Sequence, residues 1–215
     1  MKCENCGVGY ANPSFYPDSA VQYATRNARE NFARQFFSNY YGEQAFWSTE
    51  SGTYWLGSTM AEQFDSSQID LVSNLLIPLD TLISAELISV ILGTSGFLSN
   101  TFLKKEYFLA TMNPPAWIET LPQNLHYIYA VGVAPQFYYE ANSWKAAEQM
   151  AFRNLAHSIY TSLTVLQKNA AQGQEIRHEI VDAALQNVQT VARWRNMQEN
   201  VFYVLIRIPK QRQNH

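Results

Sequence analysis

The stretch Val8-Gly9-Tyr10-Ala11 returns later in the chain as Val131-Gly132-Val133-Ala134. This repeat decides the fold, because the match runs without a gap from Val8 to Phe37 at an offset of 123 (131 − 8). Eight of the thirty aligned pairs are identical, whereas chance matching at ordinary residue usage gives about two. The identical pairs are Val8/Val131, Gly9/Gly132, Ala11/Ala134, Tyr16/Tyr139, Ala24/Ala147, Ala28/Ala151, Asn31/Asn154 and Ala33/Ala156. The chain therefore contains two copies of one small module, and repeated modules without catalytic residues usually build assemblies or binding surfaces.

The likeness resumes near the end of each copy, where Val90-Ile91-Leu92 matches Val204-Leu205-Ile206 at an offset of 114 (204 − 90). The first copy therefore holds nine more residues (123 − 114) between its long helix and its closing strands. Between the copies, Met112-Asn113-Pro114-Pro115 cannot continue a helix, so the boundary is expected near residue 111. The predicted units are residues 1–111 and 112–215.

Each unit is predicted to open with a short strand, over Cys6 to Ala11 and over Tyr127 to Ala134. A loop then leads to a long helix. Its candidate N-caps are Asp18 or Ser19 in the first unit and Asn142 or Ser143 in the second.

Alanines recur every fourth residue on both predicted helices, at Ala24 and Ala28 and at Ala147 and Ala151. Such spacing places them on one face of each helix. Because alanine is small, that face can approach a sheet closely, and we expect it to be buried in both units.

The rest of each unit is predicted to be a shorter helix followed by two strands. The helices are expected at 58–66 and 176–185, and the strands at 75–79, 87–92, 188–194 and 201–208. The order strand, helix, helix, strand, strand predicts an α+β module with its helices on one face of a small antiparallel sheet.

Aromatic residues mark the extra segment of the first unit, at about residues 38–57. Aromatic side chains among small polar neighbours suit an interface that is apolar at its centre and wet at its rim. The alternative is an additional hairpin packed on its own domain. The interface candidates are Phe46, Trp47, Tyr54 and Trp55.

Composition excludes some functions. A net charge of −3 over 215 residues gives no reason to expect a nucleic-acid partner. Residues 69–92 are rich in leucine and isoleucine but contain Asp70, Asp80 and Glu86. Each carboxylate costs about 2.5–3.5 kcal/mol near a bilayer centre, so this segment is expected to be buried protein rather than a membrane span.

No motif predicts catalysis, a cofactor or a metal. Cys3-Glu4-Asn5-Cys6 is a lone pair of cysteines without the further ligands that zinc needs. Its cysteines could be thiols, form a local disulfide, or include one that carries a lipid. The Glu175 to His178 spacing has no second copy of the kind that carboxylate-bridged metal sites use. Gly7-Val8-Gly9 lacks the third glycine of a dinucleotide site and is expected to mark a bend.

The second unit resembles a family of small bacterial outer-membrane lipoproteins, named after a twenty-kilodalton lipoprotein, that includes flagellar basal-disc and H-ring lipoproteins. The resemblance lies in Pro114 to Ile118, Tyr129 to Ala134, the Ala-rich helix Lys145 to Ala156, and Ala192-Arg193-Trp194 followed by Val201 to Ile206. The first unit resembles the family more faintly, through Gly7 to Ala11 and Ala24 to Ala33.

This resemblance implies a non-enzymatic structural subunit, facing the periplasm, in a flagellar ring or disc or in the outer-membrane core of a secretion system. It implies partners within an oligomeric envelope complex, and an outer-membrane anchor for which Cys3 is the candidate lipidated residue. The rival interpretation is a soluble periplasmic binding module that holds a small ligand between the two units.

Overall fold

The computed structural model describes residues 6–49, 52–94, 113–169 and 174–210. The first half forms β1 (Cys6–Ala11), α1 (Pro17–Phe36), β2 (Phe37–Thr49), β3 (Gly52–Ser58), β4 (Ala61–Gln63), α2 (Ser67–Ser73), β5 (Leu76–Ile83) and β6 (Ile88–Thr94). The second half forms η3 (Ala116–Ile118), β7 (Tyr127–Pro135), α3 (Glu140–Tyr160), β8 (Thr161–Asn169), β9 (Gln174–Gln186), β10 (Gln189–Asn196) and β11 (Val201–Pro209). The predicted α+β class is confirmed, whereas the predicted boundary near residue 111 lies outside the described residues.

Both halves repeat a strand, a long helix and a closing hairpin. The two sheets have the equivalent orders β1-β6-β5 and β7-β11-β10. Their registers agree as well, because Gly9 lies opposite Val90 in one sheet and Gly132 lies opposite Val204 in the other. The predicted order of an opening strand followed by a long helix is therefore confirmed in both halves.

The repeated glycines and alanines are explained by a close contact between strand and helix. A Cβ atom at Gly9 would lie 1.8 Å from the Ala24 carbonyl oxygen, and one at Gly132 would lie 2.0 Å from that of Ala147. Real Cβ atoms do not approach backbone atoms so closely, so only glycine allows this helix position. The alanines of both stripes are fully buried, as predicted.

The repeated asparagines form the same hydrogen bond in each half. Asn31 Nδ2 donates to the Val8 carbonyl and Asn154 Nδ2 donates to the Val131 carbonyl, both at 2.8 Å. Each bond joins the long helix to the opening strand, which explains why asparagine occurs at both positions.

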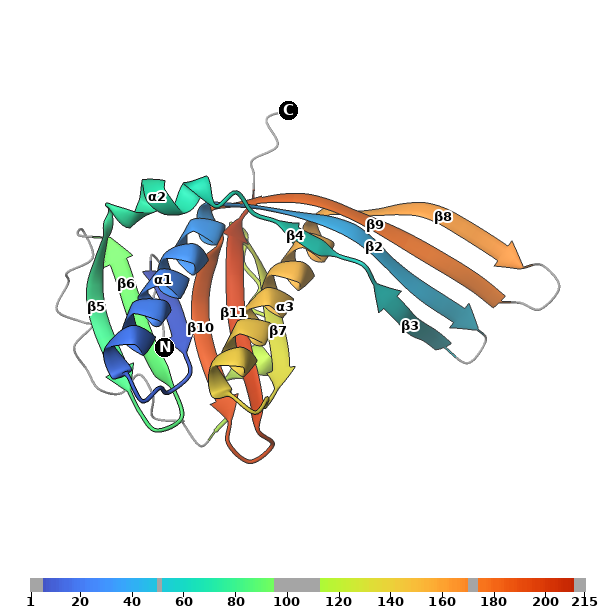
Figure 1. Cartoon of the computed structure of the whole chain (residues 1–215). Coiled ribbons are helices and arrows are strands. Elements are labelled where there is room, and N and C mark those ends of the chain that lie inside the picture. The colour runs from blue at the N-terminus through green and yellow to red at the C-terminus, as the bar shows by residue number, and fades with distance from the viewer. Residues whose placement is uncertain (1–5, 50–51, 95–112, 170–173, 211–215) are drawn as a thin grey trace.

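The two halves are joined by a long projecting sheet, which we call the arm and which consists of β2, β3, β8 and β9. Strand β2 of the first half pairs antiparallel with β9 of the second, from Phe37 opposite Gln186 to Ser48 opposite Glu175. The strand order is β3-β2-β9-β8, and β4 also pairs with β2. Figure 1 shows the arm extending well beyond the helices and sheets of the body.

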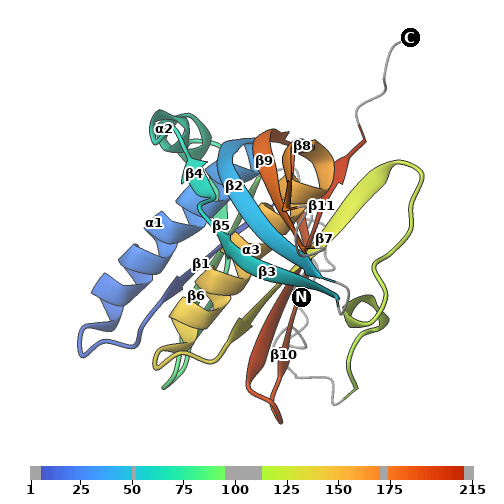
Figure 2. The same ribbon diagram turned by 90° about the vertical axis from the view of Figure 1, so that its right-hand side faces the viewer.

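The body is also shared between the halves. Gly7 and Gly9 face α1, so Cys6, Val8 and Tyr10 lie on the opposite face of their strand. These three residues belong to one buried cluster with residues of α3. Helix α3 thus packs on the second sheet and also contacts β1 of the first (Figure 2).

Two of the predicted helices are wrong. Residues 176–185 lie within strand β9, where buried Val181, Ala183 and Leu185 alternate with exposed neighbours. This period of two indicates a strand, and pairing with β2 satisfies its backbone. Residues 58–66 contain the end of β3 and all of β4, and the short helix α2 begins only at Ser67.

None of the described helices is both long and apolar enough to span a membrane.

Candidate functional site: the cleft between the two halves

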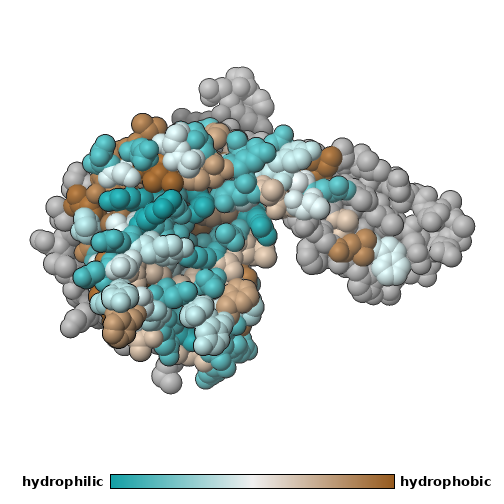
Figure 3. Space-filling model, in the orientation of Figure 1, coloured by the Kyte–Doolittle hydropathy of each residue, from teal (hydrophilic) through white to brown (hydrophobic). Residues whose placement is uncertain are grey.

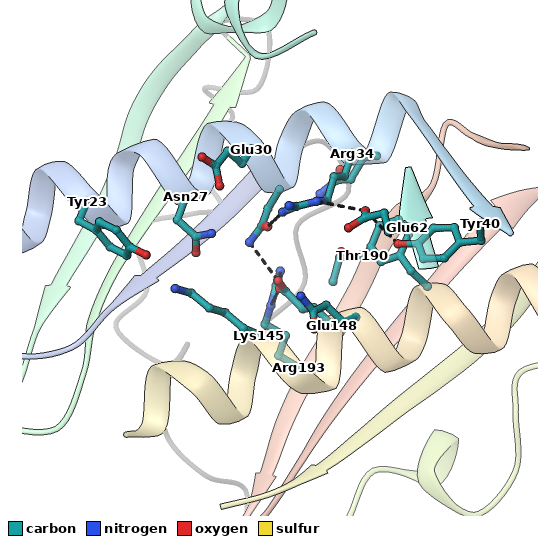
Figure 4. Close-up of a pocket in the computed structure, with 14 residues that line it drawn as sticks. Tyr23, Asn27, Glu30, Arg34, Tyr40, Glu62, Lys145, Glu148, Thr190 and Arg193 are labelled. Carbon is teal, nitrogen blue, oxygen red and sulfur yellow. Dashed lines mark hydrogen bonds and ion pairs between the residues drawn. The ribbon is translucent and has the colours of Figure 1, made fainter. Parts of the chain in front are cut away.

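A polar cleft of about 210 Å³ lies between α1 and α3. Figure 4 shows α1 on one side, α3 on the other and β10 behind them. The surrounding face of the body is mainly hydrophilic (Figure 3). Its lining side chains include Tyr23, Asn27, Glu30, Asn31, Arg34, Tyr40, Glu62, Lys145, Glu148, Thr190 and Arg193.

A buried ion pair forms the centre of this cleft. Arg193 on β10 donates from Nε to Glu148 Oε1 of α3 at 2.9 Å, and its Nη2 contacts the same oxygen. Only 6% of the Arg193 side chain and 10% of the Glu148 side chain are exposed. Removing two charges from water is costly, so such a pair persists only when further hydrogen bonds complete it.

The first half supplies those further hydrogen bonds. Tyr10 of β1 donates its hydroxyl to Glu148 Oε1 at 3.1 Å, and Asn31 of α1 donates Nδ2 to Glu148 Oε2 at 3.0 Å. The Tyr10 ring also stacks on Trp144 of α3, with ring centroids 6.1 Å apart. Glu148 is therefore a polar contact point between the two halves within the body.

Burial raises the pKa of Tyr10 well above its ordinary value of 10.0. The positive charge of Arg193 opposes this rise in pKa, and the negative charge of Glu148 adds to it. Tyr10 thus remains a neutral hydrogen-bond donor.

A second group of polar contacts continues from Asn31 toward the arm. Arg34 Nη1 donates to Asn31 Oδ1 at 3.0 Å, and Arg34 Nε lies 3.1 Å from Glu62 Oε1. Tyr40 donates its hydroxyl to the same Glu62 oxygen at 3.0 Å. Burial is the main cause that raises the pKa of Tyr40, followed by the negative charge of Glu62.

The polar groups of the cleft bind one another and so connect the two halves. The two most enclosed carboxylates, Glu148 and Glu62, are bound to guanidinium and phenol groups of the protein itself. Within the described residues, no group of three or more His, Cys, Asp or Glu side chains could hold a metal ion.

The predicted interface residues come together on the arm rather than in the cleft. Phe46 lies opposite Trp55, and Trp47 lies opposite Tyr54, on the paired strands β2 and β3. The alternative interpretation, a hairpin packed on its own domain, describes β2 and β3 only in part. Strand β2 pairs with β3 on one side and with β9 of the second half on the other.

The predicted lipid site, Cys3, lies outside the described residues. Cys6 is disulfide-bonded, and the chain contains two cysteines in total. A disulfide that uses Cys3 and a thioether-linked lipid on Cys3 exclude each other.

Sequence reasoning missed Glu148, Arg193 and Tyr10. One signal was present, because Glu148 lies three residues before Ala151 and so borders the predicted buried face, where the first copy has Thr25. A carboxylate at such a position indicates a buried partner. The sequence held no comparable signal for Arg193, which lies 45 residues away.

No family model, curated protein or solved structure matches the chain.

Proposed function

We propose that the protein is a non-enzymatic structural subunit of a large bacterial envelope machine associated with the outer membrane. A flagellar basal-body disc or ring and the outer-membrane core of a secretion system both fit this proposal. The observation that carries it is the arm, a sheet built from both halves that projects from a body with a fixed joint.

The arm has the size and the edges of an assembly element. Its longest strands, β2 and β9, have 13 residues each, which corresponds to about 40 Å at roughly 3.3 Å per residue. Among the described strands, β3 and β8 are the outer ones. Outer strands present unpaired backbone groups that can accept a strand from a neighbouring subunit.

The buried joint supports the same function. Buried polar contacts can fix one relative orientation of two parts, even where they add little net stability. An arm held in one direction by such a joint places its tip at a defined point of an assembly.

Replacing Trp47 and Trp55 with serine tests the proposal. The double variant is expected to keep its thermal unfolding curve but to be lost from the outer-membrane fraction and from high-molecular-weight particles on gradients. The matched control is Leu71→Ser, since Leu71 is 66% exposed on α2 and its change should leave fractionation as in the wild type. A folded double variant that still fractionates with the particles would remove the arm as the contact surface.

The periplasm is the proposed compartment. The disulfide at Cys6 supports it, because disulfides persist mainly in oxidising compartments. Intact-mass measurement of protein from the native cell envelope distinguishes the two fates of Cys3: a loss of two hydrogens indicates a disulfide, and an added diacylglycerol indicates the lipid anchor.

A second candidate function is binding of a small ligand in the cleft. The favouring observation is Lys145, whose Nζ lies 5.0 Å from the Tyr23 ring centroid at the cleft wall. Native mass spectrometry of the purified protein tests it. A bound small molecule that disappears in Lys145→Ala would support this function over the structural one.

A further inference from the structure

One end of the body carries the same exposed aromatic pair twice. Phe15 and Tyr16 precede α1 and meet edge to face, with ring centroids 5.3 Å apart. Tyr138 and Tyr139 precede α3 and meet in the same way at 4.7 Å. The two pairs are equivalent in the repeat, because both residues are related by the offset of 123 (138 − 15 and 139 − 16).

These rings face water rather than the core. Phe15 and Tyr138 are each 92% exposed, and Tyr16 is 68% exposed. Both pairs lie in loops that join an opening strand to a long helix, and Figures 1 and 2 show these loops at the end of the body opposite the arm. The two hairpin turns at the same end add further exposed apolar side chains. We call this surface the aromatic end: Phe15, Tyr16, Ile83, Tyr138, Tyr139 and Met197.

Among the described residues, three carboxylates are exposed beside the aromatic end: Asp18, Glu86 and Glu199. Arg195 has a side chain only 14% exposed, and its Nη1 donates to Glu140 Oε2 at 2.9 Å and lies 3.9 Å from Glu86 Oε2. Lys145 of α3 is half-buried, and it lines a hollow with Asn12 of the first loop and lies over the Tyr23 ring. No lysine or arginine occurs in the loops 12–16, 84–87, 136–139 and 197–200.

We infer that the aromatic end docks on the surface of a zwitterionic phospholipid bilayer. Aromatic rings at the tips of separate loops suit a flat surface that they can enter, and tyrosine and phenylalanine are favoured where apolar and wet regions meet. The six residues line neither of the described hollows near α1 and α3, so they do not form a pocket. The ammonium groups of phosphatidylcholine and phosphatidylethanolamine are the outermost charges of such a bilayer and complement the carboxylates.

This inference goes beyond the proposed function and does not rest on it, because it concerns the end of the body opposite the arm. The test is flotation of the purified full chain with vesicles of phosphatidylcholine alone and of phosphatidylcholine with 30% phosphatidylglycerol. We expect binding to the first and weaker binding to the second, since the carboxylates repel anionic lipid. Phe15→Ser combined with Tyr138→Ser should reduce binding to phosphatidylcholine at least about tenfold.

The matched control is Leu125→Ser, because Leu125 is 87% exposed but precedes the start of β7 at the other end of that strand. It should bind vesicles as the wild type does, and circular dichroism should show all variants folded, since the changed side chains are exposed. Three results would overturn the inference: no flotation of the wild type with phosphatidylcholine, flotation only with the anionic vesicles, or equal flotation of the double variant. If the wild type does not float but the double variant loses a co-purifying protein, the aromatic end is a protein-docking surface instead.

Discussion

At the scale of single residues, Glu148 marks a difference between the two copies of the module that changes how the halves contact each other. The equivalent residue of the first half is Thr25, which makes a hydrogen bond only to its own helix, at the Val21 carbonyl. Glu148 instead accepts hydrogen bonds from Tyr10 and Asn31 of the other half. The same helix position thus makes a local contact in the first half and a contact between the halves in the second.

Glu148→Ala is expected to lower the free energy of unfolding by about 3–5 kcal/mol, because it leaves the Arg193 guanidinium buried without its carboxylate. The double variant Glu148→Met, Arg193→Met should lose less than the single one, since no unpaired charge remains. Urea unfolding at pH 7 measures both. Glu30→Ala is the control, because its ion pair with Arg26 is at the surface and should contribute less than about 1 kcal/mol. A double variant less stable than Glu148→Ala would contradict this explanation.

Tyr10 predicts how stability depends on alkaline pH. Its pKa in the folded protein is raised above the ordinary value of 10.0. Above pH 10 the unfolded chain therefore loses the phenol proton while the folded protein keeps it, and the free energy of unfolding falls as pH rises. Below pH 10 this contribution is fully present. Tyr10→Phe should make the decline between pH 9 and pH 11.5 shallower in urea titrations, and an unchanged slope would show that Tyr10 is not the group responsible.

At the scale of elements, the alanine faces of α1 and α3 set how closely the helices approach their sheets. Ala151→Leu is expected to lower the free energy of unfolding by about 1–3 kcal/mol, because the added atoms must push α3 away from β7. Differential scanning calorimetry measures the loss. The neighbouring Met150 is 40% exposed, so Met150→Leu should change stability by less than about 0.5 kcal/mol. Equal melting curves for the two variants would place Ala151 outside the buried face.

Local patterns predicted the elements that pack against their own neighbours in sequence. The opening strands, the long helices and the closing hairpins all follow from repeated residues or from apolar periodicity. Strand β9 did not. Its apolar residues Ile176, Ile180 and Ala183 fit a helix stripe as well as a strand, and its pairing with β2 and β8 decides between them. The partner β2 lies more than a hundred residues earlier, so no local pattern indicates it.

The candidate site was predictable in part for the same reason. The aromatic residues of the first half were predicted as a group, and the structure places the four named ones on the paired strands β2 and β3. The polar contacts of the cleft were not predictable, because they join residues of different halves. The packing of α3 against β1 brings those residues together.

At the scale of the whole molecule, the shared arm makes the two halves interdependent. We expect a protein cleaved at a protease site engineered within residues 95–112 to elute as one particle in size-exclusion chromatography, and to separate only in denaturant. The reason is that β2 and β9 pair along nearly their full length and that Glu148 accepts hydrogen bonds from Tyr10 and Asn31 of the first half. Val181→Pro should let the cleaved halves separate, since proline in a central strand removes a ladder hydrogen bond. Halves that separate at once without this substitution would show that the arm does not hold them.

The pairing of β2 with β9 also means that β2 is synthesised well before its partner strand. Glu175 leaves the ribosome 127 residues after Ser48, its partner in the ladder (175 − 48), which takes roughly 6–25 s at about 5–20 residues per second. During this interval the edge of β2 that pairs with β9 is open, and an open strand edge of that length can capture other chains. The nascent protein must then be kept from its neighbours until its last third emerges, so its yield in a cell should depend on chaperone capacity more than its final stability would suggest.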